Sequence, residues 1–204
     1  MLESVIDAAF WTVLRIQVFT CNMLGLGAQA VHTLRRMQAL RPDDFFVLTT
    51  LAHFLGQRDA GLAAPDRAEA IALLERALEQ QPHNALLHFN RAFLLEQHSL
   101  LAEAEQAFRQ AVGIDEKLDR AWYGLGLVLI RQHRFEEALL ALKRNTSLQP
   151  MSPFGWYQMA RVHLDLNQPE KTEEIIRHLH GFEPKVAEQL RRETGLGKAT
   201  RTPR

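Results

Sequence analysis

Apolar residues recur along the chain at the spacing of helices that bury one face. Trp122, Leu125 and Leu129 stand at positions i, i+3 and i+7, which share one side of an α-helix. Phe135 and Leu142 begin and end a second apolar row a few residues further on. No segment alternates apolar and polar residues over enough positions to indicate a β-strand. The pattern therefore predicts an all-α chain in which short amphipathic helices follow one another in pairs.

The same kinds of residue also return at a constant interval. Turn-marking residues stand 40, 34, 34 and 34 positions apart, and alanines stand twelve positions before the first four of them. The turn markers are Pro42, Pro82, Glu116, Pro150 and Pro184, and the alanines are Ala30, Ala70, Ala104 and Ala138. A fixed period of this length indicates supersecondary units that bury their apolar faces by stacking on one another.

The period divides the chain into segments with different expected structures. Six extra residues in the first complete repeat should form a loop around 57–66, where Gly61 and Pro65 lie. Gly195 should end the last helix. The leading helices should be capped at their N-termini by Asp44, Asn84, Asp119 and Ser152. We expect an N-terminal helix and degenerate first repeat at 1–44, repeats at 45–84, 85–118, 119–152 and 153–186, a capping helix at 184–194 and a frayed basic tail at 195–204.

The units resemble the tetratricopeptide repeat, a helix–turn–helix motif of 34 residues. The resemblance covers 11–186 and is weakest in 11–44, where Gln17 takes a core position. It is strongest in 119–152, through Trp122, Leu125, Gly126, Phe135, Ala138 and Pro150. The resemblance implies an all-α, right-handed solenoid of stacked repeats with a C-terminal capping helix. It also implies a non-catalytic protein-interaction module, which could be an adaptor, an assembly factor or a co-chaperone; a dedicated secretion chaperone or a cytochrome-assembly factor is the alternative.

In tetratricopeptide proteins the leading helices line a concave face, and this resemblance places the partner-binding residues. Trp122 and Trp156 fill core positions, so Tyr123 and Tyr157, one residue on, are rotated by about 100° and should face outward. Aromatic and arginine side chains are the usual composition of binding hot spots. We expect a partner protein or peptide with apolar anchors beside Asp or Glu. The predicted groove consists of Phe46, His53, Phe89, Asn90, Phe93, Arg120, Tyr123, Leu127, Arg131, Tyr157 and Arg161.

A second surface is predicted on the first helix, which is apolar on nearly every side over 10–19. Such a helix is normally buried all round, but the helix of an end repeat has a neighbour on one side only. We expect it to meet a second copy, a partner subunit or, less readily, a membrane surface, and polar residues such as Asn22 argue against a membrane span. The candidate homodimer surface is formed by Phe10, Trp11, Leu14 and Val18.

Composition and charge remove several function classes. The 24 Lys and Arg balance the 24 Asp and Glu, which argues against a nucleic-acid partner. Cys21, the single cysteine, can form neither an internal disulfide nor a thiolate zinc cluster. His178 and His180 lie two residues apart and so on different helix faces, and we expect no metal site. Without a disulfide or an export pattern, we expect a cytoplasmic protein.

An enzyme with its active site in the groove is the rival class. It would need an acid and a base close together, but the groove-side acids Glu96 and Asp165 stand two repeats apart. Gly25 opens a match to the dinucleotide fingerprint G-x-G-x-x-A, which requires a strand before it and a βαβ unit around it. We therefore expect no catalytic residue and no cofactor.

Overall fold

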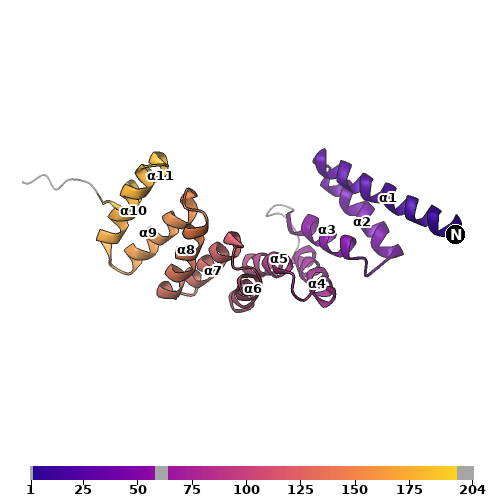
Figure 1. Cartoon of the computed structure of the whole chain (residues 1–204), viewed down its shortest axis with the longest axis horizontal. Helices are drawn as coiled ribbons and strands as arrows, with labels where there is room; N and C mark the ends of the chain where they lie inside the picture. The colour runs from indigo at the N-terminus through magenta and orange to yellow at the C-terminus, as the bar shows by residue number, and fades with distance from the viewer. Residues whose placement is uncertain (1, 58–63, 197–204) are drawn as a thin grey trace, which may run out of the picture. The chain divides into compact units, whose positions relative to one another are not determined.

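The computed structural model describes residues 2–57 and 64–196, and the side chains of residues 7–57 and 66–196. All regular structure in this part of the chain is α-helical, which confirms the predicted all-α repeat fold (Figure 1). The helices are α1 (Leu2–Met23), α2 (Gly27–Leu40), α3 (Phe45–Gln57), α4 (Ala64–Gln80), α5 (Ala85–Gln97), α6 (Leu101–Ile114), α7 (Asp119–Arg131), α8 (Phe135–Leu148), α9 (Pro153–Asp165), α10 (Pro169–His180) and α11 (Pro184–Thr194).

The chain divides into two compact units, Met1–His98 and Ser99–Arg204, called unit 1 and unit 2 below. The division falls between α5 and α6, inside the repeat predicted at 85–118. The loop predicted around 57–66 and the predicted basic tail fall largely on 58–63 and 197–204, which lie outside the described residues.

In unit 1 each helix from α1 to α5 packs on the next one along the chain. The small residues of the sequence pattern lie at the helix contacts, since Ala30, Ala52 and Ala70 are fully buried. Small side chains allow two helix backbones to approach closely, so their recurrence explains the stacking. The larger core side chains around them include Leu34, Met37, Leu48, Leu51 and Leu55.

In unit 2 the helices from α6 to α11 pack in the same consecutive way. Gly124 of α7 faces Phe108 of α6 so closely that an added Cβ would lie 2.4 Å from the Phe108 Cζ atom. Gly126 stands equally close to Leu142 of α8, so α7 needs glycine at both positions. The predicted capping helix is confirmed as α11, and Gly195 ends it with a positive φ of 71°.

The predicted N-terminal caps are confirmed at two of the four positions. The Asn84 side chain accepts hydrogen bonds from the backbone N–H groups of Leu86 and Leu87, and the Asp44 side chain accepts one from Val47. Asp119 was wrong, because α7 already includes this residue and Leu118 precedes the helix. Ser152 holds the capping position of α9 and makes no side-chain capping bond there.

Candidate functional site

Unit 1 contains a groove between α1 and α3 that holds two of the predicted partner-binding residues. Its volume is about 460 Å³. Phe46 and His53 lie in it, and the guanidinium carbon of Arg15 stands 4.3 Å from the centre of the Phe46 ring. The lining of this α1–α3 groove consists of Thr12, Arg15, Ile16, Val18, Phe19, Asn22, Phe46, Thr50, His53 and Phe54. It combines apolar walls with a cation.

The α1 wall of this groove is the part that the sequence analysis missed. Ile16 and Phe19 are exposed apolar side chains that face the groove beside Phe46. The repeat pattern is degenerate over 11–44, so the position of α1 as a leading helix could not be used to place them.

The other unit 1 residues predicted for the groove lie on α5. Phe89 is half-buried, whereas Asn90 and Phe93 are exposed. None of the three lines the α1–α3 groove, whose walls come from α1 and α3. The structure therefore brings Phe46 and His53 together and leaves the α5 residues as a separate group within unit 1.

Unit 2 brings the remaining predicted residues onto α7 and α9, which contact each other. Tyr123 and Tyr157 are half-buried and pack against the core of this unit, so neither is sealed inside it. The arginines of this set are exposed, and Leu127 is half-buried. We call this surface the α7–α9 face; it consists of Arg120, Tyr123, Leu127, Arg131, Tyr157 and Arg161.

The tryptophans explain why the tyrosines keep part of their surface. Trp122 and Trp156 are themselves half-buried rather than fully enclosed in the core as expected. The Trp122 indole N–H donates to the carbonyl of Glu116 at 3.0 Å, and the Trp156 indole N–H donates to the carbonyl of Pro150 at 2.9 Å. These equivalent bonds hold each ring over the preceding turn, and the next residue is directed away from it.

A carboxylate of the chain itself already lies on the α7–α9 face. The Tyr157 hydroxyl donates a hydrogen bond to the Glu193 carboxylate of α11, which also accepts one from Gln189 at 2.9 Å. The bond from Tyr157 and then that from Gln189 hold the pKa of Glu193 below its ordinary value, and the charge of Arg161 acts in the same direction. The bond to Glu193 and then burial raise the pKa of Tyr157. This face therefore stabilises a negative charge.

The predicted homodimer surface needs a correction. Trp11, Leu14 and Val18 are buried in the core of unit 1, together with Cys21, so they cannot form an exposed surface. Of the four predicted residues only Phe10 is exposed. The core contacts of α1 use the face on which these buried residues lie, and the opposite face of the helix is open.

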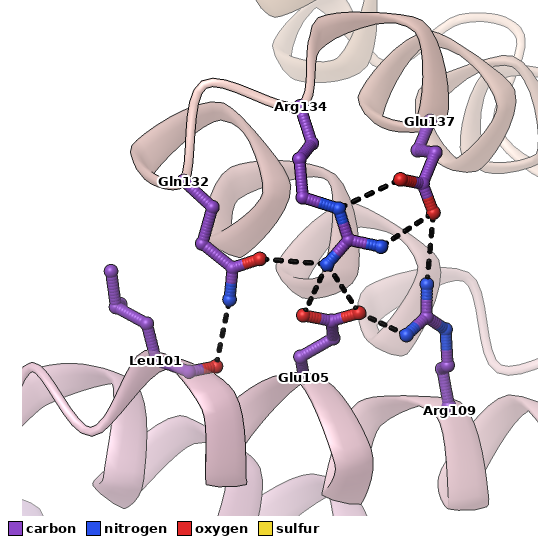
Figure 2. Close-up of polar contacts among 6 residues, drawn as sticks. All are labelled: Leu101, Glu105, Arg109, Gln132, Arg134 and Glu137. Atoms are coloured by element: carbon purple, nitrogen blue, oxygen red, sulfur yellow. Dashed lines mark hydrogen bonds and ion pairs between the residues drawn. The ribbon is translucent and has the colours of Figure 1, made fainter.

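Charged side chains gather at one further place, where α6 meets the turn between α7 and α8 (Figure 2). The buried Glu105 carboxylate accepts hydrogen bonds from Arg134 at 2.7 and 2.8 Å and pairs with Arg109. Arg134 also donates to both oxygens of Glu137, at 2.7 and 2.6 Å. Gln132 completes the network by donating to the Leu101 carbonyl at 3.2 Å.

The charges of this network are mutually compensated. Burial acts to raise the pKa of Glu105, but the hydrogen bond from Arg134 and the charges of Arg109 and Arg134 lower it below its ordinary value. The hydrogen bond from Arg134 likewise lowers the pKa of Glu137. Carboxylates kept ionised by arginine pairs are poor proton donors at neutral pH. The arrangement fits the fastening of α6 to the following helix pair.

The remaining chemical candidates of the sequence form no site within the described ranges. No group of three or more His, Cys, Asp or Glu there could hold a metal ion. Gly25 follows the helix α1 and occupies the turn before α2, so the strand that a dinucleotide fingerprint requires is missing there. His98 and His133 lie in turns as expected. None of the helices described is both long enough and apolar enough to cross a bilayer.

Known proteins provide a family match and structural relatives. A model of the family described as tetratricopeptide repeat matches residues 55–119. No curated protein sequence matches the chain.

Solved structures resemble the fold over most of the chain. MamA (41-end) from Desulfovibrio magneticus RS-1 has a TM-score of 0.77 and 16% sequence identity, over 85% of this chain and 95% of that chain. A further crystal structure of MamA has a TM-score of 0.74 and 16% identity, over 83% and 95% of the two chains. YrrB, described as a TPR protein with an unusual peptide-binding site, has a TM-score of 0.69 and 16% identity, over 86% and 88%. At these identities the likeness concerns the fold.

Proposed function

Because this chain belongs to the tetratricopeptide-repeat family, we propose that it is a non-catalytic protein-interaction scaffold that binds a partner segment on the α7–α9 face. The partner would present apolar side chains beside Asp or Glu. Adaptors, assembly factors and co-chaperones all work through surfaces of this kind. A cytoplasmic location remains a prediction from the sequence.

The observation that carries the proposal is the position of Glu193. This carboxylate accepts a hydrogen bond from Tyr157, and Arg161 stands with its guanidinium carbon 5.9 Å from the centre of the Tyr157 ring. A surface that stabilises a carboxylate of its own chain offers the same donors to an acidic residue of a partner. Half-buried Tyr123 and Leu127 would supply the apolar contact next to it.

The charge pattern supports an acidic rather than a basic partner. Arg120, Arg131 and Arg161 are exposed on α7 and α9, and Arg131 donates a hydrogen bond to the Ser99 hydroxyl at 2.9 Å. Bonding to a neutral hydroxyl leaves the positive charge of Arg131 uncompensated by that contact. Arginine pairs with carboxylates through two parallel hydrogen bonds, which would set the orientation of the partner.

The test is affinity purification of the full chain followed by mass spectrometry, with a variant in which both Tyr123 and Tyr157 are replaced by alanine. We expect the variant to lose proteins that the parent retains. Leu140→Ala is the matched control, because Leu140 is exposed on α8 and lies outside the face. Circular dichroism should show that both variants remain folded. Recovery of the same proteins by the parent and the folded double variant would refute the proposal.

A further inference from the structure

The N-terminal helix α1 has two faces, and only one of them is used within the chain. Trp11, Leu14, Val18 and Cys21 follow one another at spacings of three, four and three residues and are buried in unit 1. On the other side, a second row of residues follows the spacing of three and four and is exposed at every position. We call this row the α1 seam; it consists of Ala9, Thr12, Ile16, Phe19 and Met23.

The spacing of the α1 seam is that of a helix that packs lengthwise against another helix. Apolar residues alternating at three and four positions form the contact row of paired helices, because the average of 3.5 keeps the row facing its partner. In the sequence, Val5 and Leu2 continue the same spacing. The single hydroxyl of the row is already satisfied, since Thr12 donates to the carbonyl of Ala8 at 2.8 Å. Burial of the seam would therefore leave no side-chain donor without a partner.

We propose that the α1 seam is the contact between two copies of this chain, with the seam of one copy packed on the seam of the other. This inference is independent of the α7–α9 face. It replaces the buried residues of the sequence prediction with the opposite side of the same helix.

Charge favours a second copy over other occupants. The described charged side chains of α1 are engaged within the chain, because Asp7 pairs with Arg41 and Arg15 lies over the Phe46 ring. The seam itself carries no charge, so two identical seams meet without repulsion and without an unpaired ion. A helix that lies on a membrane normally carries many Lys and Arg on its polar face, whereas α1 has Arg15 as its single basic residue.

The available area is sufficient for a specific contact. Seven of the fifteen large apolar side chains that are exposed in the described part of the chain lie between Phe10 and Leu26. Val13, Ile16, Phe19 and Met23 are between 58% and 69% exposed. Together they offer roughly 500 Å² per copy, so that a symmetric pair would bury about 1,000 Å², the lower limit for a biological interface.

The α1–α3 groove adds a second wall to this contact. Thr12, Ile16 and Phe19 belong both to the seam and to the groove lining. A helix of the second copy that lies on the seam would therefore also meet Phe46 and Phe54 of α3. This extends the contact beyond a single pair of helices, which gives specificity to an otherwise uniform apolar row.

The test is sedimentation velocity of the full chain at about 1 to 100 µM, a range in which dimers with a micromolar Kd are detected. We expect a species with twice the mass of the 23.3 kDa chain. Ile16→Asp should raise the dimer Kd on the order of 100-fold, because it buries an unpaired carboxylate in the contact. Gln17→Asp is the matched control, since it adds the same charge one residue away on an exposed position outside the seam.

The variants also test the alternatives. Met23→Asp repeats the change at the other end of the seam, and circular dichroism shows whether each variant keeps its helices. A folded Ile16→Asp monomer beside a Gln17→Asp dimer would support the proposal. It would be overturned by a parent that stays monomeric throughout, by folded seam variants that dimerise as the parent does, or by a monomeric parent that sediments with phosphatidylcholine–phosphatidylglycerol vesicles.

Discussion

Replacement of Gly124 by alanine tests whether the close approach of α7 to α6 limits the stability of unit 2. A Cβ atom at this position would lie 2.4 Å from Cζ and 2.5 Å from Cε1 of Phe108. Carbon atoms at rest stand about 3.5 to 4.0 Å apart, so the new atom would overlap the ring by more than about 1 Å. The Phe108 side chain is 1% exposed, and its ring therefore has no open space into which it can move.

The magnitude follows from a comparison with Gly113, which is exposed near the end of α6 and would place a new Cβ with nothing within 4 Å. Both substitutions gain the better helix propensity of alanine, up to about 1 kcal/mol. Only Gly124→Ala adds the cost of overpacking, which is typically about 1–3 kcal/mol. We therefore expect Gly113→Ala to be neutral or stabilising, and Gly124→Ala to have a free energy of unfolding about 1–3 kcal/mol lower than Gly113→Ala.

Urea unfolding followed by circular dichroism measures both free energies under the same conditions. The double variant with Phe108→Leu identifies the cause, because a smaller side chain at 108 should reduce the penalty of Gly124→Ala. The reasoning would be refuted if Gly124→Ala were as stable as Gly113→Ala, or if Phe108→Leu left the penalty unchanged.

Three further predictions concern polar contacts. Asn84→Ala should lower the free energy of unfolding by about 1 kcal/mol through the loss of two capping bonds, whereas Ser152→Ala, which removes no such bond, should change it little in the same urea titration. The lowered pKa of Glu105 means that its contribution to stability is complete above the unfolded pKa of about 4.3 and is lost as the pH falls through the lower folded value. The free energy of unfolding of the parent should therefore decrease more steeply with falling pH, below about pH 5, than that of Glu105→Gln, and parallel pH curves would contradict this. In a Tyr123→Phe background, where Tyr157 is the remaining tyrosine, absorbance titration should find a phenol pKa above its ordinary value that returns toward it in Glu193→Gln.

The repeated architecture was predictable from single residues because it depends on size and on turn geometry. The alanines at 30, 70, 104 and 138 recur at a constant period and are fully buried in the structure. Gly195 and the charged row before it indicated the end of α11, and the helix ends there. Such signals are local, since a helix contact admits only small residues and a left-handed helix end favours glycine.

The candidate site was predictable only in part. Tyr123 and Tyr157 could be placed by rotation from their neighbouring tryptophans, and both keep an exposed portion. The contact of Tyr157 with Glu193 joins residues 36 positions apart, and no local pattern indicates it. The wrong cap at Asp119 has a similar origin, because the turn before α7 places Leu118 ahead of the helix and Asp115 bonds the backbone of that turn instead.

The sequence by itself determined that paired helices would stack, because a period of 34 residues with small contact positions leaves few other ways to bury the apolar faces. Only the tertiary structure decided which side of α1 is covered. Trp11, Leu14 and Val18 are as apolar as Ile16 and Phe19, so hydrophobicity alone cannot separate the two sides. The positions of α2 and α3 bury the first set and leave the second exposed, because an end helix has neighbours on one side only.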